Sequence, residues 1–153
     1  MSVLTDFFAA TNEELAVLAI EWGPLPRGGA PVGTTLPTVP STGVLNMQVG
    51  ALDRLITGTP YTSLEASGAV DTIARENGAD GPWVFTLRRA LRDGLADLSD
   101  GRVMTVAQAW GEDAGMAARG EDFRVLEGLI TDLCGLARAA RATGRDIYLW
   151  VST

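Results

Sequence analysis

The clearest indication of the fold is a stretch near the end of the sequence, residues 121–152, EDFRVLEGLITDLCGLARAARATGRDIYLWVS. Its first two thirds carry apolar residues every three or four positions, which is the spacing of one buried face of an α-helix. Acidic Glu121 and Asp122 precede this helix and arginines gather at its end, in agreement with the helix dipole. Gly144 suits the position just after a helix. We therefore expect a long helix here, spanning on the order of 30 Å.

The last part of this stretch, DIYLWVS, predicts a β-strand. Its nearly continuous apolar character is typical of an interior strand that is covered on both faces of a sheet. The single cysteine, Cys134, lies in the apolar stripe of the preceding helix, which indicates a small core residue and not a nucleophile. The chain is thus expected to close with a buried strand.

The stretch before the long helix has the same kind of pattern. WVF, residues 83–85, predicts a short strand that leads into a helix with leucines at helical spacing over 87–98. Ser99 and Asp100 then restart a helix that runs to Trp110. We expect these two helices to form a hairpin around the turn at 98–101.

Nearer the start, the pattern is less regular. The aromatic pair Phe7 and Phe8 predicts a first helical turn, and Thr11 with Glu14 fits a capping box for a short helix ending near Trp22. A further helix is expected over 44–56, with a stop at Thr57-Gly58. Residues 59–82 are expected to be irregular, with one or two helical turns at 70–75.

Between the first two helices lies GPLPRGGAPVGTTLPTVPST, residues 23–42, with five prolines. We interpret it as an ordered, extended surface crossing. Pro37 and Pro40 lack backbone donors, so its second half is an edge strand or a polyproline-like segment. The whole layout, residues 1–153, predicts a single α+β domain in which several helices pack on a small mixed sheet.

The composition excludes several kinds of chemistry. All 12 basic residues are arginine, with no histidine and no lysine. A Ser-His-Asp or Cys-His site, a histidine-ligated zinc and a lysine Schiff base are therefore excluded. The net charge of −7 disfavours nucleic acid and favours a basic protein partner. Without an apolar run long enough for a membrane span and without a signal peptide, the sequence predicts a cytoplasmic protein.

No motif offers a cofactor or metal site. The acidic residues around 111–122 lack the spacing of a calcium loop, so we interpret them as a solvated loop and a helix start. Gly28 and Gly29 belong to no phosphate-binding motif. We therefore predict no cofactor, no metal and no catalytic residue.

A resemblance adds to this picture. The segments VLTDFFAATNEELAVL, VGALDRLITGTPYTSL, PWVFTLRRALRDGLADLS and LCGLARAARATGRDIYLWVST resemble, in order and apolar pattern, the YfbM-like family of small bacterial proteins. Many members have a tryptophan and a histidine where this chain has Leu52 and Asp53. The resemblance implies an α+β fold, no established enzyme activity and no transferable functional residue.

These observations favour a binding protein without catalysis, and most sharply an immunity protein that masks the active site of a toxin with an acidic surface. The oligomeric state is left open. One alternative is a small enzyme or ligand-binding protein that uses Arg88, Arg92 and Asp53. Another is a subunit of a larger assembly, which would expose an extensive apolar patch. The predicted partner contacts are Trp22, Arg27, Trp110, Glu112, Asp113, Glu121 and Asp122.

Overall fold

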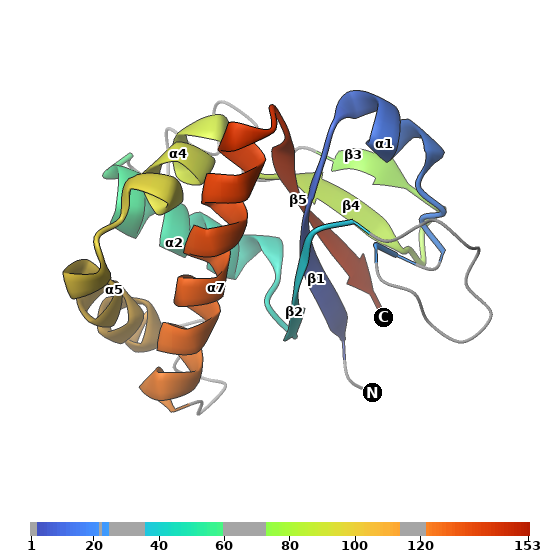
Figure 1. Cartoon of the computed structure of the whole chain (residues 1–153). Helices are drawn as coiled ribbons and strands as arrows, with labels where there is room; N and C mark the ends of the chain where they lie inside the picture. The colour runs from blue at the N-terminus through green and yellow to red at the C-terminus, as the bar shows by residue number, and fades with distance from the viewer. Residues whose placement is uncertain (1–2, 22, 25–35, 60–72, 114–121) are drawn as a thin grey trace.

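The computed structural model describes residues 3–21, 23–24, 36–59, 73–113 and 122–153 (Figure 1). Five helices and five strands lie in these ranges. In chain order they are β1 (Leu4–Ala10), α1 (Asn12–Val17), β2 (Thr38–Thr42), α2 (Asn46–Thr57), β3 (Ile73–Glu76), β4 (Trp83–Thr86), α4 (Arg89–Asp97), α5 (Asp100–Glu112), α7 (Phe123–Ala142) and β5 (Asp146–Ser152).

The strands form one sheet in the order β2-β1-β5-β4-β3. Every pairing is antiparallel, so the expected mixed sheet is wrong and the sheet is antiparallel throughout. The reason is that each strand returns along its neighbour, and no βαβ crossover joins two neighbouring strands in the same direction. The first and last strands pair at the centre, with Leu4 opposite Ser152, so the start of β1 lies beside the end of β5.

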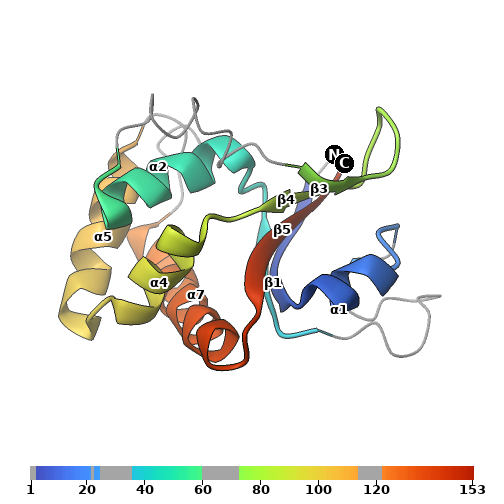
Figure 2. The ribbon, with the colours of Figure 1, turned by 90° about the horizontal axis from the view of Figure 1, so that it is seen from above.

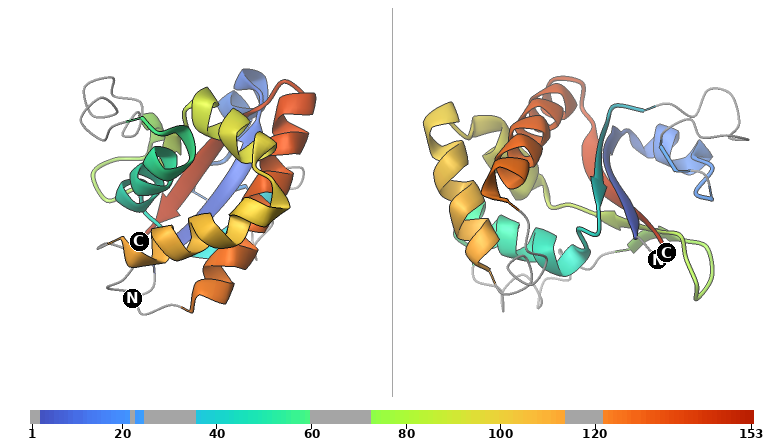
Figure 3. Two further views of the ribbon diagram at one scale, coloured as in Figure 1. Left: turned by 90° about the vertical axis from the view of Figure 1, so that its left-hand side faces the viewer. Right: turned by 90° about the horizontal axis from the view of Figure 1, so that it is seen from below.

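Helices cover the two faces of this sheet unequally. α2, α4, α5 and α7 form a layer on one face, and α1 lies on the other (Figures 2 and 3). α7 contacts β1, β2 and β5, while α4 and α5 pack mainly on α7. The protein is therefore an α+β fold with a long C-terminal helix and a central last strand, as the sequence predicts.

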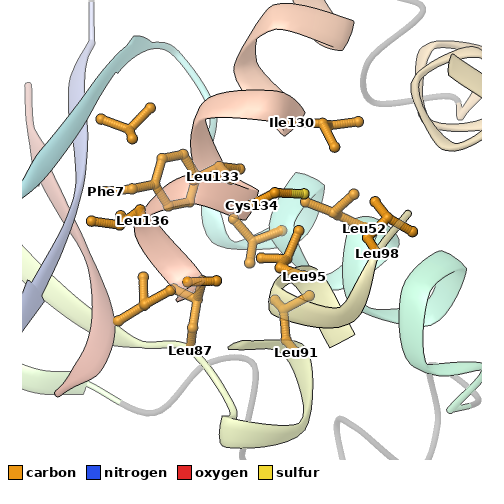
Figure 4. Packing of buried hydrophobic residues seen from close by; sticks show 14 of the residues in the cluster. Phe7, Leu52, Leu87, Leu91, Leu95, Leu98, Ile130, Leu133, Cys134 and Leu136 are labelled. Atoms are coloured by element: carbon orange, nitrogen blue, oxygen red, sulfur yellow. The ribbon is translucent and has the colours of Figure 1, made fainter. Parts of the chain in front are cut away.

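A large apolar core fills the space between the sheet and the helical layer (Figure 4). Leucines of α4 and α7 meet Phe7 of β1 there, and Cys134 lies among them, also buried. A smaller cluster that includes Phe8, Tyr148 and Trp150 covers the α1 face. Burial of about 25 cal/mol per Å² of apolar surface makes the larger cluster the main source of stability.

The helical turn expected at Phe7 and Phe8 is wrong. Residues 4–10 form a β-strand and not a helical turn, with Phe7 and Phe8 pointing to opposite faces and both fully buried. Successive side chains of a strand alternate between faces, and both faces of this sheet are covered. Two adjacent aromatic residues can therefore both be buried, and the alternating pattern that reveals a strand disappears.

The β2 strand is an edge strand, one of the two forms expected for it. Backbone bonds from Ala9 N to Pro37 O and from Gly43 N to Val3 O fix which of its residues face β1. By this alternation, Pro40 lies at a position whose missing N–H would point away from β1. Proline is therefore tolerated here at no cost to the ladder.

The α1 helix begins as predicted and ends early. The Thr11 hydroxyl accepts from Glu14 N, and the Glu14 carboxylate accepts from Thr11 N, which completes the capping box. The helix stops at Val17 and not near Trp22, which lies outside the described residues. Arg75 of β3 donates from Nη1 to the carbonyl oxygens of Leu15 and Leu18, so an arginine of the neighbouring strand satisfies this helix end.

Two helix ends follow their glycine signals. Gly58 ends α2 with a φ of 72°, and Gly144 follows α7 with a φ of 66°. After α7, Arg145 N donates to Ala140 O and Gly144 N donates to Arg141 O, the two bonds of a Schellman motif. A residue with a side chain would be strained at either of these positive φ angles. The glycine backbone conformation therefore ends the two helices.

Two other expectations are wrong. Residues 73–76 form β3, so the helical turns expected at 70–75 do not reach this segment. The strand pairs with β4 through a bulge between Ile73 and Arg75, which breaks the strand pattern in the sequence. The helices α4 and α5 do not form a hairpin, because both pack mainly on α7. Within the described ranges, no helix is long and apolar enough to cross a membrane.

Candidate protein-binding surface

The predicted contact residues divide into three groups. Trp22, Arg27 and Glu121 lie outside the described residues. Trp110 belongs to the core. The three remaining carboxylates, Glu112, Asp113 and Asp122, lie at one end of the helical layer, as described below.

Trp110 does not belong to a binding surface, and the prediction that it contacts a partner is wrong. It is 0% exposed, between α5 and its neighbours. Its indole Nε1 donates to the carbonyl oxygen of Gln48 in α2 at 2.9 Å. The large ring and its single donor are thus both satisfied inside the protein, and Trp110 holds α2 and α5 together.

The carboxylates gather where α5 ends and α7 begins. Glu112 is the last residue of α5, and Asp113 caps its end. Asp122 is the N-cap of α7, and its side chain accepts from Arg124 N at 3.0 Å. A methyl group on Gly111 would lie 3.2 Å from Leu126 Cδ1, so the end of α5 closely approaches the start of α7 (Figure 1).

Two apolar side chains accompany these carboxylates. Phe123 is 39% exposed and Val125 is 58% exposed, both in the first turn of α7. We name the set Glu112, Asp113, Asp122, Phe123 and Val125 the acidic end. One feature of the sequence indicates this surface: Val125 departs from the three- and four-residue spacing that buries Leu126 and Ile130.

An ion pair with a buried carboxylate joins two other helices of the layer. Arg88, just before α4, donates from Nε and Nη2 to both carboxylate oxygens of Asp53 in α2, at 2.8 and 2.6 Å. The hydroxyls of Thr57 and Thr59 also accept from Arg88 Nη2. The hydrogen bond with Asp53 raises the pKa of Arg88, which keeps the guanidinium charged. Two residues of the enzyme alternative therefore meet, but they neutralise each other and join α2 to α4.

The third residue of that alternative lies elsewhere. Arg92 donates from Nη1 to the carbonyl oxygen of Arg145 at 2.9 Å and lies 3.5 Å from Asp146. Arg89 also binds Asp146, with Nε 2.9 Å from Oδ1. These contacts fasten α4 to the start of β5.

The C-terminal half of α7 uses its charges in the same way. Arg138 donates to the carbonyl oxygens of Ala96 and Leu98 at the end of α4, at 3.1 and 3.0 Å. These carbonyls have no partner within α4 because the helix ends there. An arginine fork fits two of them at once, which a lysine ammonium does less well.

An ion pair joins this region to α1. Arg145 donates to Glu14, with its Nε 2.8 Å from Oε1. This hydrogen bond, helped by the backbone N–H of Thr11, lowers the pKa of Glu14 from 4.5 to about 2. Glu14 therefore serves both the capping box and the tertiary contact.

Neither a cysteine nucleophile nor a metal site is favoured by the residues that the structure describes. Burial raises the pKa of Cys134, which makes a thiolate nucleophile unfavourable there. Among the described residues, no three His, Cys, Asp or Glu side chains are grouped so as to hold a metal ion. The acidic end presents the exposed carboxylates of Glu112 and Asp122 beside apolar side chains, the combination found in protein interfaces with a charged rim. The half-buried Asp113 pairs with Arg54 at 3.8 Å.

Comparisons with known proteins identify no relative: no family model, no curated protein and no solved structure matches the chain. The resemblance to the YfbM-like family therefore stays a prediction.

Proposed function

We propose that the protein is a non-catalytic binding protein that recognises a basic protein partner through its acidic end. In the sharpest form of this proposal it is an immunity protein that covers the active site of a toxin. The observation that supports it is the exposure of Phe123 and Val125 next to Glu112 and Asp122. Apolar side chains at the centre of an interface supply affinity, and surrounding charges supply association rate and selectivity.

The charge balance of the chain supports a positively charged partner. The chain carries a net charge of −7, and all 12 of its cations are arginines. Five of them make intramolecular contacts at the α4 end: Arg88, Arg89, Arg92, Arg138 and Arg141. A basic surface would be attracted at long range, and this attraction weakens as salt is added. The association rate with a toxin should therefore fall at high ionic strength.

The test uses the product of any neighbouring gene that encodes a toxin-like domain. Isothermal titration should give a stable complex, and co-expression should protect cells from the toxin. Val125→Arg and Glu112→Arg should each weaken binding by about tenfold. Asp80→Arg is the matched control, because it makes the same charge change as Glu112→Arg in the exposed turn after β3, far from the acidic end. Failure to bind, together with no protection, would contradict the proposal.

The two alternatives receive less support. Arg88 and Asp53 bind each other, so an enzyme or ligand site built on them would first have to break this buried pair. An assembly subunit should expose an extensive apolar patch. The exposed large apolar residues are instead distributed over several elements: Leu4, Val17, Leu45, Met47, Ile73, Met104, Phe123 and Val125.

A further inference from the structure

A groove of about 420 Å³ runs between β2 and the N-terminal half of α7. The two elements lie side by side (Figures 1 and 3). Ser41 and Val44 belong to one wall, and Arg124, Gly128 and Asp132 belong to the helix wall. The volume falls in the range of natural ligand sites. The groove opens next to the acidic end, because Val125 belongs to both.

Gly128 gives the groove its depth. No atom of the described residues lies within 4 Å of a methyl group placed on it. Glycine in a helix interior destabilises the helix relative to alanine, and here no internal packing requires it. Gly135 on the same helix has equally open surroundings but does not line the groove, so it provides a matched control.

Opposite charges mark the two ends of the helix wall. Arg124 and Asp132 are both exposed, and within the described part of the chain the side chain of neither one forms an ion pair. The three residues Arg124, Gly128 and Asp132 are four positions apart, so successive Cα atoms rise by roughly 6 Å along the helix. Alternate residues of an extended chain are about 6.6 Å apart. Residues i, i+2 and i+4 of a strand therefore match the three positions.

The space between the charges contains apolar side chains as well as the polar Ser41 and Thr42. Val44 and Leu129 line the groove between its ends. At the open edge of β2, Pro40 cannot donate a backbone hydrogen bond, so an added strand cannot form an unbroken ladder there. Recognition must therefore depend on side chains and on the spacing of charges.

We propose that this groove binds an extended peptide segment whose acidic and basic side chains, four residues apart, flank an apolar one. The acidic side chain pairs with Arg124, the basic one with Asp132, and the apolar one lies over Gly128. This inference rests on the proposed function only in taking the segment from the partner protein. The preference of the groove itself is tested without the partner.

The probe is the synthetic peptide Ac-Ser-Asp-Thr-Val-Thr-Arg-Ser-NH2, followed by heteronuclear NMR titration of the purified protein. Chemical shifts should move along α7 from Arg124 to Asp132 and along β2. A second peptide, Ac-Ser-Thr-Asp-Val-Thr-Arg-Ser-NH2, has the same composition but places the charges on opposite faces. It should bind about two- to fivefold more weakly, the effect of losing one exposed ion pair.

Two glycine variants separate binding from folding. Gly128→Leu fills the groove and should weaken binding of the first peptide by at least about tenfold. The helix should be as stable as in the wild type or more stable. Gly135→Leu makes the same change outside the groove and should leave peptide binding unaltered. Equal peptide affinity in both variants would overturn the proposal.

A charge swap tests the orientation of the segment. In Asp132→Arg, the Asp-Val-Arg peptide should bind about two- to fivefold more weakly, and a peptide with aspartate at both charged positions should regain that loss. Shifts elsewhere on the protein, or equal binding of an ω-amino fatty acid of matching length, would overturn the peptide assignment. If the toxin domain binds at the acidic end with Gly128→Leu unimpaired, the groove proposal fails and the proposed function stands. If the peptides bind and no toxin does, the reverse holds.

Discussion

The two halves of α7 use their charged residues in opposite ways. In the C-terminal half, Arg138 binds the end of α4, and Arg141 pairs with Asp97 at 2.9 Å. In the N-terminal half, the side chains of Arg124 and Asp132 form no ion pair with any described residue, and Phe123 is exposed beside them. Charge on this protein is therefore structural at the α4 end, whereas Arg124 and Asp132 beside the groove are exposed and available for binding.

The largest expected effect breaks the buried pair at the α4 end. Arg88→Met leaves the Asp53 carboxylate buried without its counter-ion, and removal of one partner of such a pair costs about 3 kcal/mol. Arg124→Met, the same change at the open half of α7, should alter the free energy of unfolding by less than about 0.5 kcal/mol. Urea denaturation measures both. Equal losses would remove the distinction between the two halves.

A smaller loss is expected when Arg138 is changed. Arg138→Met deprives the carbonyls of Ala96 and Leu98 of two charge-assisted hydrogen bonds, at a cost of about 1.5 kcal/mol in urea denaturation. Arg138→Lys should recover only part of this, because an ammonium lacks the planar fork. Full recovery by lysine would show that charge alone suffices.

Two glycine-to-alanine changes should have opposite signs. The new methyl group in Gly94→Ala would lie 2.6 Å from Ile56 Cγ2, and the clash between α4 and α2 should cost about 1 kcal/mol. In Gly128→Ala the methyl group meets open space, and the better helix former should stabilise the protein by up to about 1 kcal/mol. Thermal melting of both variants decides the sign. Stabilisation by Gly94→Ala would show that α2 yields easily.

The smallest effect concerns pH. The pKa of Glu14 is lowered on folding, so its pairing with Arg145 stabilises the protein fully above about pH 4.5 and loses this effect as the pH falls towards 2. Glu14→Gln lacks this contribution. The difference in urea midpoint between wild type and variant should therefore shrink from pH 7 to about pH 3. A constant difference would contradict an ionised pair.

The local patterns that predicted the fold correctly are those in which one element shows its own period or cap. The 123–142 helix has a single buried stripe, the Thr11 and Glu14 pair caps α1, and the last strand is apolar from Ile147 to Val151. Each signal is contained in a few neighbouring residues. The edge position of β2 followed from Pro40 for the same reason.

The predictions that were wrong concern contacts between residues far apart in the sequence. Phe7 and Phe8 resemble a helical pair until the sheet is known to be covered on both faces. Trp110 seemed to border a loop, but its indole meets Gln48, 62 residues away. For the candidate site, the acidic residues were predictable as a cluster. The groove was not, because its walls come from β2 and α7.

The most direct test of the proposed binding surface is a chemical-shift map of the protein in complex with the basic partner proposed above. We expect changes at Glu112, over 122–132 and along β2, with none centred on Arg88 or Arg138. Changes centred on the α4 end, with the first half of α7 unaffected, would contradict it.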